Sequence, residues 1–336
     1  MSQNKLSRIP TWLLWVVGGA VFGIILRIVF GELPRDLRGP MSLAFLVVTP
    51  LVIGALTVYG ARQTQRSWRF VLFAPWLTVL LMFLGCALAL LEGSICIALL
   101  APLFLACSSI GGLVMEVALR TSGHSQSQLR AIAVLPFLMI AVEGKVPLQD
   151  RQFEIRRSLH VNAAPETVWK EILSARNIQE NELPLSLTHL IGVPKPLEGI
   201  NVKTSDGEVR YSRWDRGVNF TAKVISRKDN ESITWRYTFN ESSFPEGSMD
   251  EHVEIGGQYF DLGDTTFNLI RLPENKTLLE VVAHYRVTTS INFYAAPAAA
   301  ILGQDFLHML LSLYKSRSET AEQRHVAQQI IQAGPP

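Results

Sequence analysis

The chain contains no lysine or arginine between Phe70 and Leu119, and the formal charges in this interval are Glu92 and Glu116. A water-soluble domain does not need so long an apolar stretch, since a buried core helix is apolar over about 10–14 residues. A helix of about 20 apolar residues spans the hydrocarbon core, because each residue adds about 1.5 Å against roughly 30 Å. Divided at Glu92-Gly93, the stretch therefore predicts two membrane spans.

Cysteine is also scarce, with three residues in the whole chain. Cys86, Cys96 and Cys107 all lie in the same apolar stretch, and the second half of the chain has none. This excludes a disulfide framework and a cysteine metal site in the second half. The sequence also lacks G-x-S-x-G, Walker and G-x-G-x-x-G motifs, so no cofactor is indicated.

The two halves of the chain differ in charge. Residues 1–150 carry 11 Lys/Arg and 6 Asp/Glu, whereas residues 151–336 carry 20 and 23. A basic membrane half follows the preference for Lys and Arg in cytoplasmic loops. A mildly acidic second half argues against nucleic acid as a partner, since phosphate binding needs a concentrated basic face. We expect a membrane domain over 1–145, a soluble domain over 150–318, and a helix end and tail over 319–336.

The membrane domain is predicted to contain four spans and a doubtful fifth. The fifth segment, residues 131–142, is short and contains Pro136. If it is re-entrant or interfacial, the soluble domain is cytoplasmic; if it spans, with Arg130 and Lys145 extending to the interfaces, that domain is periplasmic. We favour the spanning alternative. The four other segments are 12–30, 41–60, 70–91 and 94–119.

Charge at the segment ends sets the orientation. Lys5 and Arg8 precede the first span, and Arg62, Arg66 and Arg69 crowd the second loop. These basic loops alternate correctly if the N-terminus is cytoplasmic.

A few residues inside the spans carry structural expectations. Arg27 lies near a helix end and is expected to extend to the interface, while Glu116 is expected to pair with Arg120 four residues later. Gly19 and Gly23 form a G-x-x-x-G pair that predicts close helix packing.

From Gln152 the apolar period changes from helical to alternating, which predicts a strand over 152–161. Pro165 suits the first turn of a helix that follows, because its missing N–H is not needed there. Further strands are predicted with turns at Gly217, Gly263-Asp264 and Pro273, and Gly256-Gly257 is expected to mark a strand bulge. They cover 208–216, 218–227, 232–240, 252–262, 265–272 and 277–289, and a long helix follows over about 298–323.

Consecutive strands without intervening helices indicate an antiparallel sheet. A strongly curved sheet around one long helix leaves a gap that side chains alone do not fill, which favours an apolar ligand cavity. The predicted fold class is therefore an α-helical multi-pass membrane bundle followed by an α+β domain, a curved antiparallel sheet around a long C-terminal helix. The expected lining residues are Trp169, Trp235, Tyr237, Tyr259, Phe267, Tyr285, Phe306 and Leu310.

The segment FEIRRSLHVNAAPETVWKEIL, residues 153–173, resembles the opening of the START-related superfamily of polyketide cyclase/dehydrase-like proteins, called SRPBCC. This resemblance implies the helix-grip fold for the second domain. The terminal segment AAAILGQDFLHMLLSLY is similar to the last element of that family. Members bind lipids, sterols, polyketides or other apolar ligands, and some are enzymes. The resemblance implies that a loop over 188–196 gates the cavity mouth. The whole chain resembles uncharacterised bacterial membrane proteins, which implies a multi-pass protein of the cytoplasmic (inner) membrane.

Three functions stay open. The first is non-enzymatic, membrane-anchored binding or transfer of a lipid or other hydrophobic ligand. The second is a cyclase/dehydratase- or hydrolase-like enzyme acting on a membrane-soluble substrate, with Arg213 orienting it and His252 with Asp250 as acid/base candidates on one strand face. The third is a structural or regulatory subunit of a membrane complex. The acidic cluster around His252 has one histidine and no cysteine, so no metal site is expected.

Overall fold

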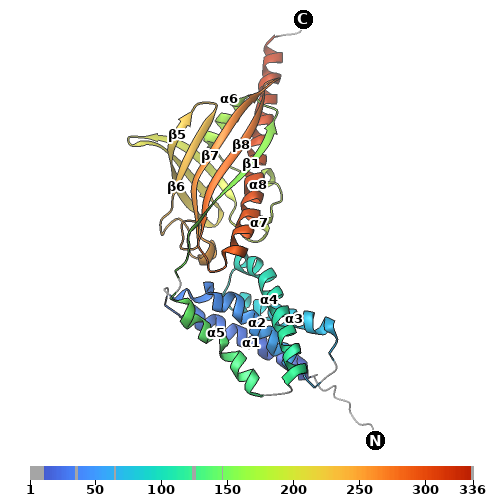
Figure 1. Ribbon diagram of the computed structural model, residues 1–336. Helices are drawn as coiled ribbons and strands as arrows, with labels where there is room; N and C mark the ends of the chain where they lie inside the picture. The colour runs from blue at the N-terminus through green and yellow to red at the C-terminus, as the bar shows by residue number, and fades with distance from the viewer. Residues whose placement is uncertain (1–10, 35–36, 64–65, 123–125, 146, 334–336) are drawn as a thin grey trace. The chain divides into compact units, whose positions relative to one another are not determined.

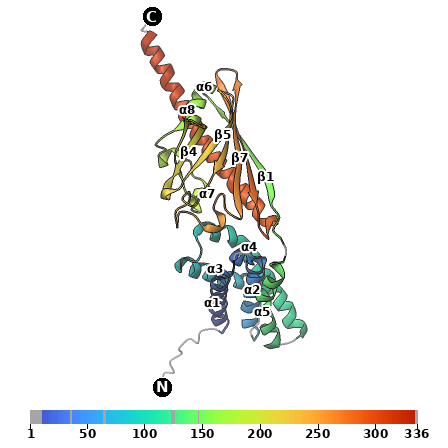
Figure 2. The same cartoon turned by 90° about the vertical axis from the view of Figure 1, so that its left-hand side faces the viewer.

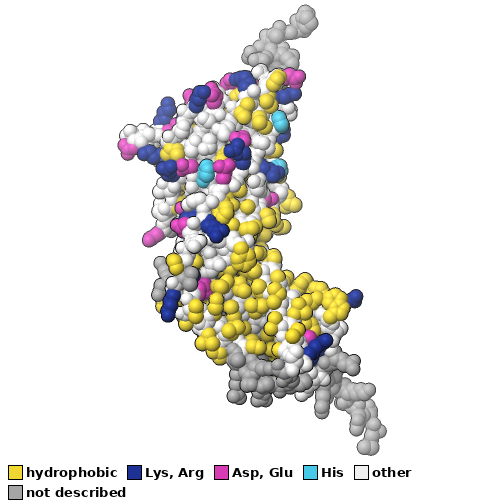
Figure 3. Space-filling view, in the orientation of Figure 1, with side chains coloured by type: hydrophobic (Ala, Val, Ile, Leu, Met, Phe, Trp, Pro, Cys, Tyr) yellow, Lys and Arg dark blue, Asp and Glu magenta, His cyan; other side chains and the backbone are white. Residues whose placement is uncertain are grey.

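The computed structural model describes residues 11–34, 37–63, 66–122, 126–145 and 147–333. The chain divides into two compact units, Met1–Leu148 and Gln149–Pro336. Lys5 and Arg8 lie outside the described residues, as do residues 334–336 of the expected tail. Figure 3 shows hydrophobic side chains over much of the visible surface of the first unit, whereas charged side chains are spread over the second.

The N-terminal unit is helical. Three of its helices, α1, α3 and α4, are long and apolar enough to cross a membrane. The predicted second span differs from its expectation, because regular α-helix begins only at Thr49 after a π-helical turn over Ala44–Val48. All of α2 except Leu51 is buried, so this helix lies inside the bundle. The helices are α1 (Thr11–Gly31), α2 (Thr49–Gly60), α3 (Trp68–Leu88), α4 (Ser94–Ser122) and α5 (Gln126–Glu143).

Glycine permits the close approach of α2 and α4. A Cβ atom on Gly54 would lie 1.9 Å from the carbonyl oxygen of Ser108, and one on Gly111 would lie 1.9 Å from that of Leu51. The two backbones thus touch at reciprocal glycines, which is how small residues bring membrane helices together. A Cβ atom on Gly19 or Gly23 would also lie within 3 Å of side chains on neighbouring helices, so their predicted packing role is confirmed.

Charges in this unit are paired. Arg27 does not extend freely to an interface as expected; its guanidinium pairs with Glu92 and donates to the carbonyl of Leu91. Glu116 pairs with Arg120 at 2.9 Å as expected, and it also accepts from Arg66 at 2.6 Å. Pairing of this kind offsets the cost of placing ionised groups among apolar helices.

Glu143 closes the helical unit at the end of α5. It accepts from the backbone N–H groups of Leu43 at 2.6 Å and Ala44 at 3.0 Å, and Arg38 lies 3.4 Å away. The N–H groups at the start of a helical segment have no partner within it, so a carboxylate is a favourable acceptor there. Glu143 thereby fastens α5 to the π-helical turn.

The C-terminal unit is one antiparallel sheet of eight strands in the order β1-β8-β7-β6-β5-β4-β3-β2, curled around the long helix α8 (Figures 1 and 2). This confirms the predicted helix-grip architecture. The strands are β1 (Arg151–Val161), β2 (Ser174–Ala175), β3 (Pro196–Thr204), β4 (Gly207–Trp214), β5 (Asn219–Lys228), β6 (Ser232–Thr238), β7 (Phe260–Leu272) and β8 (Lys276–Val287). The helices are α6 (Pro165–Leu173), α7 (Leu187–Leu190) and α8 (Asn292–Ala333).

Local chemistry accounts for the first elements. Alternation along β1 buries Ile155 and Val161, and β1 pairs with β8 along its whole length. Pro165 occupies the first turn of α6, which buries Val168, Trp169 and Ile172 on one face.

The region before β8 departs from the prediction. β7 runs through Gly263-Asp264 without a turn, and an irregularity between Leu262 and Thr265 absorbs one extra residue as a bulge. Asp264 points outward and pairs with Arg236 on the adjacent strand, which favours continued pairing. Residues 252–259 form no strand: they contain a 3₁₀ turn over Glu251–Val253 and a turn at Gly256, whose φ is +83°. The expected strand bulge at Gly256-Gly257 is therefore wrong.

The two strands at one edge of the sheet were not expected. β2 has two residues, and β3 begins at a proline and alternates weakly. The terminal helix begins at Asn292, earlier than expected, because Pro297 is accommodated near its start. Although α8 is apolar enough by composition to cross a membrane, its Gly303 packs against Ile155 of β1.

We predict that Gly54→Val destabilises the N-terminal unit, because the new side chain must separate two touching backbones. Overpacking of this kind costs about 1–3 kcal/mol or more. Gly18→Val is the matched control, since a Cβ atom on Gly18 meets nothing within 4 Å. Thermal unfolding of the detergent-solubilised protein measures the difference. Equal melting temperatures for the two variants would contradict the described α2–α4 contact.

Candidate ligand-binding interior

The centre of the helix-grip interior is filled by aromatic side chains. Trp235 on β6 and Phe267 on β7 are 1% and 2% exposed, and their rings meet edge to face at 5.3 Å. Tyr314 of α8 packs edge-on against Phe267 at 5.8 Å. These contacts join the inner face of the sheet to the helix. The middle of the unit is thus a packed core.

A buried arginine connects four elements around this core. The Arg210 guanidinium on β4 donates to the Ile172 carbonyl of α6 at 2.8 Å and to the Tyr314 hydroxyl of α8 at 3.0 Å. It also lies 4.8 Å from the centre of the Trp235 ring, a cation–π contact. A Cβ atom on Gly199 of β3 would lie 2.3 Å from Arg210 Nη2, so glycine leaves the room that the guanidinium occupies.

No ion pair to Arg210 is present among the described residues. Its charge is instead stabilised by carbonyl and hydroxyl oxygens and by the Trp235 ring, and Ile172 is near the negative end of α6. Arg210 is therefore accounted for as a structural tie within the core.

Two polar atoms in the same core make no hydrogen bond. Trp235 and Thr265 are register partners on β6 and β7, and the Trp235 indole N–H and the Thr265 hydroxyl are both unpaired and buried. Tyr237 lies two residues further along β6. Burial raises the pKa of the Tyr237 hydroxyl, although the charge of Arg210 acts in the opposite direction. Tyr237 therefore stays protonated at neutral pH and can donate or accept a hydrogen bond.

Six aromatic rings continue from the core toward one end of the sheet. We call them the aromatic row: Trp214, Phe220, Tyr237, Phe239, Phe244 and Phe306.

Successive rings of the row are 5.2–5.9 Å apart from Phe306 on α8 through Trp214, Phe220 and Phe239 to Phe244. Phe220 and Phe244 are buried, whereas the other four rings are only half-buried. Apolar inner-face surface thus remains accessible at this end, in contrast to the sealed centre.

Two loops meet beside the aromatic row. The Arg216 guanidinium donates to the Gly192 carbonyl at 2.8 Å and to the Ser248 carbonyl at 3.4 Å. Arg216 itself follows Trp214 and Asp215 in a turn that places it in the left-handed region, with φ 54°. The segments 186–195 and 241–249 are therefore linked through one exposed side chain.

Asp305 of α8 holds the loop over residues 186–195 by hydrogen bonds. Its Oδ2 atom accepts from the Ser186 hydroxyl at 2.6 Å, the Thr188 backbone N–H at 2.8 Å and the Thr188 hydroxyl at 2.7 Å. Burial acts to raise the pKa of Asp305, but these hydrogen bonds outweigh it and hold the pKa below its ordinary value. The loop is consequently fastened by an ionised carboxylate.

His189 lies on the inner side of the same loop. Its ring meets Phe306 edge to face at 6.3 Å, and its buried Nε2 atom has no hydrogen-bond partner. Burial lowers the pKa of His189, and the positive charge of Lys195 adds to this effect. The imidazole is thus neutral at pH 7.

The eight expected lining residues fall into two groups. Trp169, Trp235, Phe267 and Tyr285 are buried members of the packed core. Tyr237, Tyr259, Phe306 and Leu310 keep part of their surface accessible. Tyr237 and Phe306 belong to the aromatic row, Leu310 packs against the core, and Tyr259 contacts His252. Trp214 and Phe239, which keep accessible surface, were missed, although their alternation with Ser212 and Tyr237 indicated the inner face.

The structure does not support the enzymatic candidates as they were argued. Arg213 lies on the outer face, with 59% of its side chain exposed and Glu198 3.6 Å away. Asp250 and His252 do not share a strand face, because residues 251–253 form a 3₁₀ turn. His252 is half-buried and its ring lies 6.3 Å from that of Tyr259.

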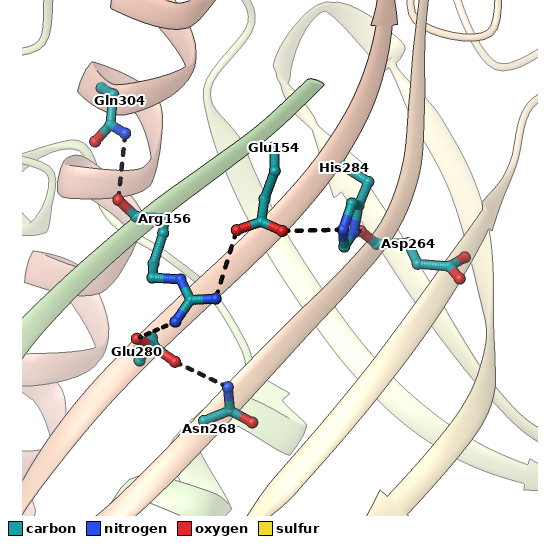
Figure 4. A network of polar contacts seen from close by, with 7 residues as sticks. All are labelled: Glu154, Arg156, Asp264, Asn268, Glu280, His284 and Gln304. Atoms are coloured by element: carbon teal, nitrogen blue, oxygen red, sulfur yellow. Dashed lines mark hydrogen bonds and ion pairs between the residues drawn. The ribbon is translucent and has the colours of Figure 1, made fainter. Parts of the chain in front are cut away.

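Other polar groups gather on the outer face of β1, β8 and β7. Glu154 lies between Arg156 and His284, at 3.4 Å from each, and Arg156 also reaches Glu280 (Figure 4). These side chains are largely exposed, and exposed ion pairs contribute about 0–1 kcal/mol. This network is a solvated sheet face.

A small cavity lies in the N-terminal unit beside the Arg27–Glu92 pair, with a volume of about 10 Å³. That is room for about one water molecule. Phe45, Met82 and Cys86 are among the residues that line it. At this volume the cavity is too small for an organic ligand. No cluster of three or more metal-ligating side chains occurs in the described part of the chain.

Comparison with known proteins finds similarity in structure. No family model matches the sequence, and no curated protein matches it. An aromatase/cyclase from Streptomyces sp. R1128 is 12% identical over 50% of this chain and 94% of its own, with a TM-score of 0.32. A START superfamily protein from Mycobacterium smegmatis is 16% identical over 50% and 98%, with a TM-score of 0.29. Norcoclaurine synthase from Thalictrum flavum is 11% identical over 51% and 87%, with a TM-score of 0.31. Similarity at this level carries no argument about activity.

We predict that Asp305→Ala loosens the loop over residues 186–193. Three donors lose their common acceptor, and each hydrogen bond to a charged group contributes about 1.5–3 kcal/mol. Hydrogen exchange of this loop should rise, while exchange in β6 stays unchanged. Asp206→Ala, at an exposed turn, is the matched control. Unchanged hydrogen exchange in the Asp305→Ala variant would contradict the role of Asp305 in holding this loop.

The same contact gives a pH dependence of defined sign. Because the pKa of Asp305 is lowered in the folded state, its contribution is complete above the unfolded value of about 3.9 and is lost as pH falls through the folded value. Loop protection in the wild type should therefore decline below about pH 4. Asp305→Asn, which keeps an acceptor oxygen without an ionisable group, should lose this dependence. An identical pH profile in both proteins would disprove the assignment.

Proposed function

We propose that the protein is a membrane-anchored binder of a lipid or another hydrophobic ligand, held in the helix-grip unit. The observation that carries this proposal is the aromatic row, whose inner-face rings stay partly accessible while the core beside them is sealed. A single Phe side chain buried against a ligand contributes about 1.5–3 kcal/mol. Several such rings supply useful affinity without any catalytic group.

The loops beside the row supply a route for the ligand. Segments 186–195 and 241–249 are joined by Arg216, and the first is fastened by Asp305. Breaking these few hydrogen bonds opens access to Phe306 and Trp214 without disturbing the core. This supports the gating role that the family resemblance implies for residues 188–196.

The N-terminal unit supplies the anchor. Its α1, α3 and α4 helices are long and apolar enough to span a bilayer. Covalent attachment keeps the helix-grip unit near lipid, which raises the effective concentration of a membrane-soluble ligand without new contacts. Transfer between the bilayer and the interior is the activity that this arrangement favours.

A structural or regulatory subunit is the second candidate. The packing of Trp235, Phe267 and Tyr314 favours it, because their contacting rings occupy the centre of the interior, where a usual ligand pocket would need several hundred Å³. The enzymatic alternative has less support, since Arg213 is on the outer face.

Ligand retention by the full-length protein tests the proposal. We predict that wild type, extracted in mild detergent, carries a hydrophobic ligand by native mass spectrometry, and that Phe306→Asp reduces the occupied fraction by about tenfold or more, because 1.4 kcal/mol corresponds to tenfold in affinity. Tyr211→Asp is the control, since Tyr211 lies on β4 facing away from the row. An empty wild type, or equal loss in both variants, would refute ligand binding at the aromatic row.

The side of the membrane is a second testable part of the proposal. α5 has 18 residues and is about 27 Å long, and its apolar part covers Ile132–Glu143. With five crossings and a cytoplasmic N-terminus, the helix-grip unit is periplasmic in a bacterial cytoplasmic membrane. In a background without Cys86, Cys96 and Cys107, Gln149→Cys should react with a membrane-impermeant maleimide on intact cells, and Asn4→Cys only after lysis. Labelling of both residues only after lysis would place the unit in the cytoplasm, with α5 not crossing the membrane.

A further inference from the structure

The helix-grip unit presents an exposed apolar face at α7 and the first turns of α8. Leu185, Leu190 and Phe293 are 92%, 73% and 72% exposed, and Ile301 and Leu187 are 61% and 45% exposed. We call these five residues the docking face. Contiguous exposed apolar side chains mark interaction surfaces in soluble units, whereas single exposed residues need no explanation. The other large exposed hydrophobics of this unit occur singly on separate strands, at Val202, Tyr211, Ile225 and Ile270.

The two parts of the docking face lie next to each other. The Thr188 hydroxyl of α7 donates to Asp305 of α8 at 2.7 Å, and its oxygen lies 3.1 Å from the Leu302 carbonyl oxygen of the same helix. Leu187 precedes Thr188 and Ile301 precedes Leu302, so these two residues of the docking face lie beside this contact. Phe293 and Ile301 are eight residues apart on α8, which places them on one side of the helix about two turns apart.

The docking face is also close to the point where the chain enters the unit. The Asn292 side-chain amide donates to the Gln149 carbonyl at 3.2 Å, and the Thr288 hydroxyl donates to Asp150 at 2.7 Å. Phe293 therefore directly follows Asn292, which is hydrogen-bonded to Gln149 at the start of the unit. Residues 144–148 separate Gln149 from the end of α5, and five residues extend at most about 18 Å.

We propose that this face docks on the lipid surface of the bilayer that holds the N-terminal unit. The inference rests on the membrane anchoring proposed above and adds a contact that ligand binding does not require. The short tether keeps Phe293 within reach of that bilayer at all times. Exposed leucine and phenylalanine side chains are of the kind that enter the boundary between headgroups and acyl chains.

Docking also involves the loop over residues 186–195, which Asp305 holds. α7 carries part of the docking face, and the loop that contains α7 covers the aromatic row through His189 and Phe306. Insertion of Leu190 into lipid therefore acts on the same segment that Asp305 fastens. The lipid surface meets the unit where the interior is most accessible.

Depth measurements on the full-length protein test this proposal. In the cysteine-free background, nitroxide labels are placed by Phe293→Cys and Leu190→Cys, with Ile270→Cys on β7 as the control at a comparably exposed apolar residue. The protein is reconstituted in nanodiscs of phosphatidylcholine and phosphatidylglycerol. We expect the ratio of oxygen to nickel-chelate accessibility to be at least about twofold higher at residues 190 and 293 than at 270, because oxygen concentrates in the acyl region.

Two results would overturn the proposal. Equal, water-like ratios at all three residues would show that the face is solvated. Protection of residue 293 from both reagents would show that protein covers it, either the N-terminal unit or a second copy. Native mass spectrometry of the same sample separates this outcome from the function: retained ligand with water-like labels disproves docking alone, whereas lipid-like labels without ligand disprove the proposed binding.

Discussion

One helix must cover the concave face of an eight-stranded sheet, and this geometric constraint determines the rest of the C-terminal unit. At the centre the constraint is met by large rings: Trp235 and Phe267 from the sheet meet Tyr314 from α8. Arg210 joins the same helix to α6 through hydrogen bonds to Tyr314 and Ile172. Toward the end that carries Trp214 and Phe306, rings only partly cover one another, and apolar surface is left accessible. The proposed binding interior is the consequence of that incomplete coverage.

The closure of that end depends on a few polar contacts. Asp305 collects three hydrogen bonds from one loop, and Arg216 links that loop to a second. Such contacts are weak compared with core packing, so local opening is less costly than unfolding. In the N-terminal unit the balance is reversed: Gly54 and Gly111 bring backbones into contact, and buried ion pairs such as Arg66–Glu116 fix the helix ends. A rigid anchor and an adjustable opening are thus built from different interactions.

Sequence periodicity predicted most of the architecture because it records which face of an element is buried. The alternation in β1, the proline at the start of α6 and the apolar spacing of α8 were sufficient for the helix-grip fold. Edge strands such as β3 were missed because their outer residues face solvent and alternate weakly. Gly263-Asp264 has the composition of a turn, yet pairing of Arg236 with Asp264 keeps β7 continuous. The hydrogen bonds of Asp305 were also not predicted from the sequence, because they join residues more than a hundred positions apart.

The central claim is that an apolar guest binds against the partly accessible rings of the aromatic row. A cryo-electron microscopy map of the full-length protein in nanodiscs of native lipid tests this most directly. The account predicts elongated non-protein density between Phe306 and Tyr237, bounded by Trp214 and Phe239. A map with no non-protein density against these four side chains would contradict it.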